Sequence, residues 1–223
     1  MAILHSDWHG DVVVLRWDDD ENRMNLGSVG EWHDTLGELA QRDGPLAVVI
    51  TGTGKFFSNG LDLDRFSSHP DEAGPIVSGV HRLLGRMLLF PAYVVTAING
   101  HAFAGGAMLS CATDLRVMRR DRGYWCLPEV DLGLPLTDAM QATVSVRLPR
   151  AAAYDAIMTG RRYSGDAALA AGIVEHLADE HDVVDRAVEL ATVMAPKHRE
   201  VIAEHKRQLF GAAAAVCGWP EGT

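Results

Sequence analysis

The sequence predicts an α/β fold with a helical C-terminal part. Over the first 120 residues, apolar stretches of strand length alternate with stretches of helical period. From about residue 135 the pattern is mainly helical. The chain has 223 residues, 48% of them hydrophobic, which is enough for one sizeable core, and no linker or internal repeat divides it. We therefore expect one domain over residues 1–223.

The first predicted elements are two strands with a helix between them. The apolar run at 12–18 (VVVLRWD) is typical of a strand. Residues 28–44 have a helical period, and Ser28 followed three residues later by Glu31 fits a helix start in which Ser28 is the N-cap. The continuous apolar run at 45–51 (PLAVVIT) is typical of a strand that is buried on both faces.

The pattern then repeats along the chain. Residues 71–89 have a helical period and precede an apolar strand at 92–99 (AYVVTAIN). Residues 103–114 (FAGGAMLSCATD) are expected to open a helix despite their two glycines, and 115–118 (LRVM) to form a short strand. The helical patterns of the C-terminal part are separated by Gly160, Gly165 and Gly172.

Composition excludes several classes of protein. The formal net charge is −10 and lysines and arginines form no long run, so we expect no nucleic-acid partner. Cys111, Cys126 and Cys217 are odd in number and are spaced neither for zinc nor for a disulfide framework, which predicts a reducing compartment. No apolar stretch reaches membrane-spanning length, and the N-terminus has no secretory pattern. We expect a cytoplasmic protein with no metal and no membrane contact.

Two segments share one pattern, in which an apolar strand leads through a turn of small residues into a helix start. They are residues 47–64 (AVVITGTGKFFSNGLDLD) and 93–110 (YVVTAINGHAFAGGAMLS). The first is no nucleotide-binding loop, because Val49 stands where that motif needs glycine and Phe56 where it needs Ser or Thr. Unpaired amides at two such turns could form an oxyanion hole, or the glycines could serve only tight turns and helix packing.

These segments resemble those of the crotonase superfamily, the enoyl-CoA hydratase/isomerase fold. Residues 56–63 (FFSNGLDL) resemble the first oxyanion segment of that family, and 98–118 (INGHAFAGGAMLSCATDLRVM) resemble the second with its helix. Residues 127–136 (LPEVDLGLPL) resemble the catalytic-carboxylate segment, and 156–177 (AIMTGRRYSGDAALAAGIVEHL) a late helical segment. ENRMN, at 21–25, stands where the family has an early CoA-contacting turn. The motifs occur in family order over nearly the whole chain.

The resemblance implies a crotonase-type ββα spiral over about residues 1–185 and a helical segment over about 186–223. It also implies an acyl-CoA thioester substrate, no separate cofactor because coenzyme A is part of that substrate, and a role in fatty-acid metabolism such as β-oxidation. Family members are trimers or dimers of trimers, assembled partly through C-terminal helices. This chain is shorter than the usual member at that end.

The resemblance assigns roles to individual residues. The backbone amides of Leu61 and Gly105 would form the oxyanion hole for the thioester oxygen, and Glu129 would be the catalytic acid–base group. Substrate contacts would come from the early turn, both oxyanion segments and the carboxylate segment, through Arg23, Met24, Ser58, Asn59, Gly60, Met108 and Leu132.

The carboxylates indicate which reaction is expected. Hydratases of this family hold a water between two glutamates, whereas here Met108 occupies one of those positions and Glu129 the other. One carboxylate can still move a proton between C2 and C4 of an acyl chain, which is a Δ3-Δ2 isomerisation, and residues 116–138 are most similar to the isomerases of plants. An enoyl-CoA isomerase is therefore predicted. The alternatives are an enoyl-CoA hydratase, another crotonase-type activity, or a non-catalytic acyl-CoA-binding paralogue.

The remaining polar residues are assigned structural roles. If the 127–136 segment is a strand, Asp131 shares a face with Glu129 and is a second, weaker carboxylate candidate. Asp62 is expected to accept turn amides, Asp114 to end the second helix, and His101 to be a loop or core residue. The N-terminal set of His5, Asp7 and His9 is expected to be exposed and not to bind a metal.

Overall fold

A six-stranded sheet forms the centre of the computed structural model, which describes residues 2–220. Its strand order is β1-β2-β4-β7-β9-β11, and only the β1–β2 pair is antiparallel. The parallel pairs follow from the helices and short strands that connect these strands, since parallel neighbours need crossover connections. The strands are β1 (Leu4–His9), β2 (Val12–Trp17), β4 (Ala47–Gly52), β7 (Tyr93–Ile98), β9 (Leu115–Arg119) and β11 (His176–Ala178).

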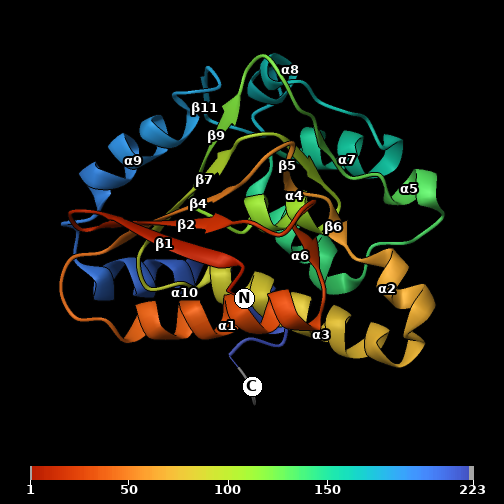
Figure 1. Ribbon diagram of the computed structural model, residues 1–223, viewed down its shortest axis with the longest axis horizontal. Helices are drawn as coiled ribbons and strands as arrows, with labels where there is room; N and C mark the ends of the chain where they lie inside the picture. Colours follow the sequence, from red (N-terminus) through yellow and green to blue (C-terminus); the bar gives the residue numbers. More distant parts are fainter. Residues whose placement is uncertain (1, 221–223) are drawn as a thin grey trace.

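Short strands form two further sheets beside the main one. One has the order β10-β8-β5, from Trp125–Cys126, His101–Phe103 and Phe56–Ser58, and the other pairs β3 (Arg23–Met24) with β6 (Gly60–Leu61). Each turn of the chain thus contributes a long strand, one or two short strands and then a helix (Figure 1). The predicted strand–strand–helix repeat and the α/β class with a helical C-terminal segment are confirmed.

The helices cover both faces of the main sheet. Helix α9 lies on one face, against β4, β7 and β9, while α1, α3 and α10 lie together below the sheet in Figure 1. The helices are α1 (Leu26–Gln41), α2 (Leu63–Ser68), α3 (Pro70–Leu88), α4 (Gly105–Cys111), α5 (Glu129–Leu132), α6 (Asp138–Arg147), α7 (Arg150–Thr159), α8 (Gly165–Ala170), α9 (Val183–Met194) and α10 (Arg199–Val216).

The central strands are buried on both faces, which explains their continuous apolar runs. Val12 and Val14 of β2 pack in a cluster with α9, whereas Val13 and Leu15 belong to the larger cluster on the opposite face. This alternation follows from the two-residue period of a strand. The larger cluster extends from Leu4 to the C-terminal Cys217, so α10 shares the main core.

One expectation for the N-terminal region was wrong. Asn25, not Ser28, is the N-cap of α1, and Ser28 completes the capping box from the third helical position. The carboxylate of Glu31 instead accepts hydrogen bonds of 2.8 Å from the amides of Ile3 and Leu4. Residues 4–9 form strand β1, which the sequence did not indicate, and His5, Asp7 and His9 are exposed as expected. The side chains of β1 after Leu4 are all exposed, so they show little of the apolar signal of a strand.

A buried ion pair connects helix α10 to the core. The Lys206 ammonium lies 2.6 Å from Asp114 and donates a hydrogen bond of 2.8 Å to the carbonyl of Ala92. Burial lowers the pKa of Lys206, and Asp114 opposes that shift. Asp114 was expected to end the second helix. It follows that helix directly, but its carboxylate joins the amide of Val94 to α10.

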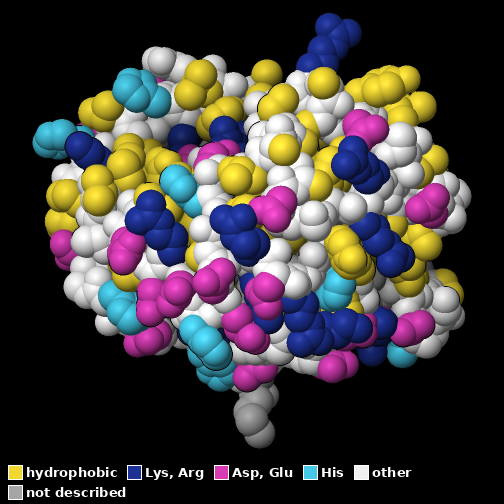
Figure 2. Space-filling model, turned by 90° about the horizontal axis from the view of Figure 1, so that it is seen from above, with side chains coloured by type: hydrophobic (Ala, Val, Ile, Leu, Met, Phe, Trp, Pro, Cys, Tyr) yellow, Lys and Arg dark blue, Asp and Glu magenta, His cyan; other side chains and the backbone are white. Residues whose placement is uncertain are grey.

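On the surface, Figure 2 shows positive, negative and apolar side chains interspersed over the face that it displays. No extended basic face is visible there, in keeping with the net charge of −10. Within residues 2–220, no helix has both the length and the apolar character needed to span a membrane.

Candidate active site

A pocket of about 610 Å³ gathers several of the predicted site residues. Its walls come from the turn before α1, the β6–α2 segment, the start of α4, and the chain from α5 to α6. Arg23, Asn59, Leu61, Gly105, Glu129 and Leu132 all line it. A second hollow, of about 670 Å³, lies between residues 40–45 and 196–203 and contains none of the predicted residues. The first pocket is therefore the candidate active site.

The two glycine turns touch each other at this pocket. Gly60 has φ = +82°, and a Cβ atom there would lie 2.8 Å from Ala104 Cβ and 3.0 Å from the amide nitrogen of Gly105. Gly106 packs as closely, since a Cβ atom there would lie 2.5 Å from the carbonyl oxygen of Ser58. Both contacts are tighter than a side chain allows. Glycine is therefore required where the β6 segment meets the start of α4.

The amides of Leu61 and Gly105 are not used by the surrounding secondary structure. Asp62 donates its amide to the carbonyl of Met24 in β3, and successive amides of a strand point in opposite directions, so the Leu61 amide points away from β3. Gly105 is the first residue of α4, and an amide at that position has no acceptor within its own helix. Both residues line the pocket.

Glu129 supplies a half-buried carboxyl at the start of α5. Its Oε2 atom is buried and has no hydrogen-bond partner, and the side chain makes no ion pair within residues 2–220. Burial raises the pKa of the Glu129 carboxyl above its ordinary value, and a hydrogen bond from its own backbone opposes that shift only in part. A carboxyl with a raised pKa and a free oxygen is suited to take a proton and return it.

Glu129→Gln is expected to raise the free energy of unfolding at pH 8 by about 1 kcal/mol, since it removes a buried and unpartnered charge. The folded-state pKa of Glu129 is raised, so the contribution of the protonated Glu129 side chain to folding stability is fully present below the ordinary glutamate pKa. That contribution is lost as the pH rises through the folded-state pKa. Urea unfolding should show a gain at pH 8 that shrinks at pH 4.5. Equal effects at both pH values would contradict a buried carboxylate.

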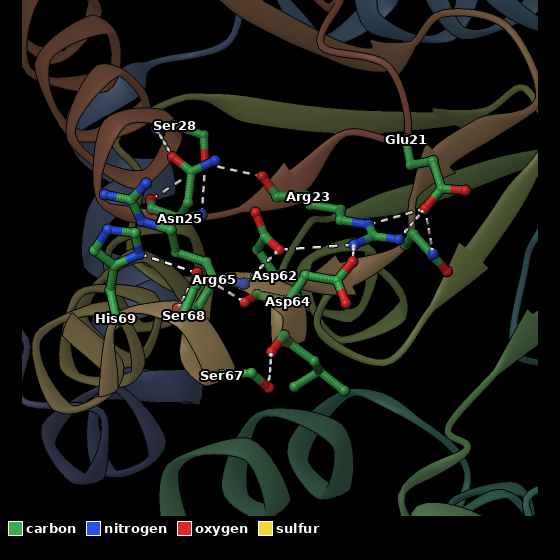
Figure 3. Close-up of polar contacts among 12 residues, drawn as sticks. Glu21, Arg23, Asn25, Ser28, Asp62, Asp64, Arg65, Ser67, Ser68 and His69 are labelled. Atoms are coloured by element: carbon green, nitrogen blue, oxygen red, sulfur yellow. Dashed lines mark hydrogen bonds and ion pairs between the residues drawn. The ribbon is translucent and has the colours of Figure 1, made fainter. Parts of the chain in front are cut away.

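A polar network holds the turn before α1 against the segment after β6 (Figure 3). The Arg23 guanidinium lies 2.7 Å from Glu21, 2.6 Å from Asp64 and 3.6 Å from Asp62. Glu21 also accepts a hydrogen bond of 2.8 Å from the side chain of Asn59. Hydrogen bonds from Arg23 and Asn59 lower the pKa of Glu21. Arg23 is thus neutralised by nearby carboxylates and fixes the residues on either side of Leu61.

Comparison with known proteins then identifies the family. The family model described as enoyl-CoA hydratase/isomerase matches residues 10–215. The chain belongs to the enoyl-CoA hydratase/isomerase family. It is 32% identical to enoyl-CoA delta isomerase 3 of Arabidopsis thaliana, with 90% of this chain and 89% of the relative covered. It is 31% identical to the peroxisomal enoyl-CoA delta isomerase 2 of the same plant, with 94% and 92% covered.

A solved structure of this family supports the fold. It is the probable enoyl-CoA hydratase EchA3 of Mycobacterium tuberculosis, which superposes with a TM-score of 0.89 at 28% identity. The superposition covers 97% of this chain and 92% of the other. The expected crotonase fold and an enzyme of the enoyl-CoA isomerase or hydratase class are thereby confirmed.

Four residues that the family resemblance placed at the substrate lie beneath the pocket wall instead. Met24, Ser58 and Met108 are at most 1% exposed, Gly60 is buried, and none of them lines the pocket. Ser58 donates a hydrogen bond of 2.7 Å to the carbonyl of Asn22 and accepts one of 3.2 Å from the amide of Gly60. These residues shape the turns that carry the lining residues.

Asp131 does not share a face with Glu129. Residues 129–132 form a helical turn, not the strand assumed from the sequence, and Asp131 packs against Gly160 outside the pocket. Asp62 accepts a hydrogen bond of 3.1 Å from the amide of Arg65 and caps α2, as expected.

The other polar candidates also lie outside the pocket. His101 is half-buried in β8, among aromatic rings. Within the described residues, no three His, Cys, Asp or Glu side chains come together as a metal site. The three cysteines are free and buried.

The sequence did not indicate two parts of this family site. One is the apolar lining, which α2, α3, α6 and the segment after α5 bring together from distant positions, chiefly Leu63, Phe66, Val77, Leu134 and Met140. The other is Arg162, which lines the pocket from the segment after α7. Arg162 stands in TGRRYSG beside a second arginine, Arg161, and no local pattern separates the two.

Proposed function

We propose that the chain is a Δ3-Δ2-enoyl-CoA isomerase and that Glu129 is its single acid–base group. The observation that carries the proposal is the half-buried carboxyl of Glu129, whose Oε2 atom has no hydrogen-bond partner within residues 2–220 and which lines one pocket with Leu61 and Gly105. A single base and an acceptor site for negative charge are what a 1,3-proton shift requires. The two plant relatives named as enoyl-CoA delta isomerases support this choice.

In this mechanism the thioester oxygen accepts hydrogen bonds from the amides of Leu61 and Gly105. Glu129 takes a proton from C2 of a 3-enoyl thioester, and the electron pair of that C–H bond delocalises through the thioester carbonyl onto its oxygen. The amides stabilise this negative charge. Glu129 then returns the proton at C4, so that the double bond moves from C3–C4 to C2–C3. No atom is gained or lost, and the reaction needs no separate cofactor.

Hydration is the second candidate, because the mycobacterial neighbour is described in one solved structure as a probable hydratase and in another as an isomerase. Hydration requires a group to activate water and a group to protonate the acyl chain, for which hydratases of the family use a second glutamate. Met108 occupies that position here. Asp64 also lines the pocket, but its carboxylate is exposed and bound to Arg23. Asp64, the other acid in the lining, is therefore held in a surface ion pair and is poorly placed to serve as the second acid of a hydratase.

Separate incubations with a 3-enoyl-CoA and a 2-enoyl-CoA test the proposal. We expect 2-enoyl-CoA from the first and no 3-hydroxyacyl-CoA from the second. Efficient hydration of 2-enoyl-CoA would replace the isomerase by a hydratase. Binding of both thioesters without turnover would identify a non-catalytic acyl-CoA-binding paralogue.

We also propose a homotrimer or a dimer of trimers, the assembly that the family resemblance implies. Sedimentation equilibrium should then give three or six times the 24.2 kDa mass of the chain. A monomer mass would contradict this assembly.

A further inference from the structure

The charged side chains that line the pocket differ in whether they form ion pairs with other side chains. They are Arg23, Asp64, Glu129 and Arg162. Arg23 and Asp64 bind each other at 2.6 Å, and Glu21 binds the other side of Arg23. Arg162, by contrast, has no ion pair or hydrogen bond with any part of the chain that the structure describes. Its guanidinium carbon instead lies 5.7 Å from the centroid of the Phe103 ring.

Arg162 belongs to a group of cations that have no carboxylate partner within residues 2–220. Lys55, Arg122 and Arg162 all lie close enough to His101 to lower its pKa, after the larger effect of burial. We call these three residues the cationic rim. The His101 ring lies among aromatic side chains, with its centroid 5.4 Å from that of Phe56 and 4.9 Å from that of Phe103, both at tilted angles.

The cationic rim stands out against the rest of the molecule. The chain has a net charge of −10, and most of its other arginines are matched by carboxylates or hold backbone carbonyls. Lys55 and Arg122 also line a hollow of about 310 Å³, together with Arg119 and Glu180, which form an ion pair with each other. Lys55, Arg122 and Arg162 are thus three cations near His101 that form no ion pair within residues 2–220, and only Arg162 of the three lines the pocket. An anionic ligand would supply the missing counter-charge.

We propose that Arg162 binds an oxyanion of the substrate, and that this oxyanion is a phosphate of the nucleotide part of the thioester. This inference rests on the proposed function, since it takes the substrate to be an acyl-CoA. The remaining lining of the pocket is largely apolar, with Leu63, Phe66, Leu132 and Leu134 among its residues, and suits an acyl chain. Arg162 lies over the Phe103 ring and near His101, which is not part of that lining, and this favours the phosphates over a carboxylate on the acyl chain.

Adjacent arginines provide a matched experiment. Arg161 lies 3.5 Å from Asp155 and over the Tyr163 ring, and it does not line the pocket. With a 3-enoyl-CoA, Arg162→Gln is expected to raise KM about tenfold and leave kcat within about twofold, as removal of uniform binding does. Arg162→Lys should restore part of the loss, because it keeps the charge but not the planar fork. Arg161→Gln should behave as the wild type.

The corresponding 3-enoyl-pantetheine thioester lacks the nucleotide phosphates and identifies the source of the oxyanion. Wild type and Arg162→Gln should show the same KM with this substrate. A defect that persists on this neutral substrate would overturn the proposal. A defect confined to pantetheine thioesters with a terminal carboxylate on the acyl chain would overturn the phosphate assignment and place the contact at the acyl end. A wild-type KM in Arg162→Gln, with the full CoA thioester as substrate, would also overturn it.

Calorimetric titration with coenzyme A alone separates this inference from the proposed function. If Arg162→Gln weakens coenzyme A binding about tenfold while the wild type lacks isomerase activity, the phosphate contact stands and the isomerase proposal fails. If the variant turns over 3-enoyl-CoA normally and binds coenzyme A as the wild type does, the isomerase stands and the Arg162 contact fails.

Discussion

Glu129→Gln should slow the isomerisation of a 3-enoyl-CoA, with a loss in kcat of about 10²–10⁴, the usual contribution of a positioned acid–base group. The substitution keeps the shape of the side chain and removes only its ability to take a proton from C2. Glu129 Oε2 has no partner within residues 2–220, and the amide oxygen of glutamine can still accept the hydrogen bond from the residue's own backbone. The variant should therefore fold normally and bind coenzyme A with nearly wild-type affinity. Initial rates and calorimetric binding of coenzyme A measure the two expectations separately.

Asp131→Asn is the matched control for this substitution. Asp131 is two residues away on the same short helix, but it packs against Gly160 and does not line the pocket. Its amide variant should keep kcat within about twofold of the wild type. Activity of Glu129→Gln within a few-fold of wild type, combined with a large loss in Asp131→Asn, would assign the base to Asp131.

Gly60→Ala should lower kcat by about 10²–10³, the range measured when one oxyanion donor is lost. An added methyl group would lie 2.8 Å from Ala104 Cβ and 3.0 Å from the Gly105 nitrogen. The two turns must then move apart, and the Leu61 and Gly105 amides would no longer face one acceptor. Steady-state kinetics with a 3-enoyl-CoA should show the loss mainly in kcat, because the donors act most strongly on the charge that develops during the reaction.

Gly54→Ala separates this effect from backbone strain. Gly54 also has a positive φ, of +63°, but a Cβ atom there would have no neighbour within 4 Å. Both variants therefore carry a conformational cost, and only Gly60→Ala forces the two turns apart. If Gly54→Ala lost as much kcat as Gly60→Ala at equal thermal stability, the close approach of the two turns would have no role in catalysis.

The sequence predicted those elements whose own residues carry the structural signal. The buried strands at 47–52 and 93–98 and the long helix at 70–88 lie within a few residues of their predicted ranges, because their apolar periods are strong. Strand β1 was missed because most of its side chains are exposed. The α1 cap was misplaced because Asn25 and Ser28 are both good capping residues and cap each other.

The candidate site was predictable where its residues stand within a family motif, as Leu61, Gly105 and Glu129 do. The sequence did not distinguish residues that line the pocket from residues that support it. Met108 and Ser58 are in the right segments, but their side chains are buried beneath the wall. Arg162 could not be separated from Arg161, because their difference lies in which rings and carboxylates surround each guanidinium after folding.

Transfer of an isotope label tests most directly whether Glu129 alone carries the proton from C2 to C4. The substrate is a 3-enoyl-CoA with deuterium at C2, incubated with the wild-type protein in ordinary water, and the 2-enoyl-CoA product is analysed by NMR and mass spectrometry. One carboxyl shielded from solvent should deliver a substantial fraction of the deuterium to C4, and the transfer should be lost together with turnover in Glu129→Gln. A product whose new C4 hydrogen comes wholly from water in the earliest turnovers would contradict transfer by a single base.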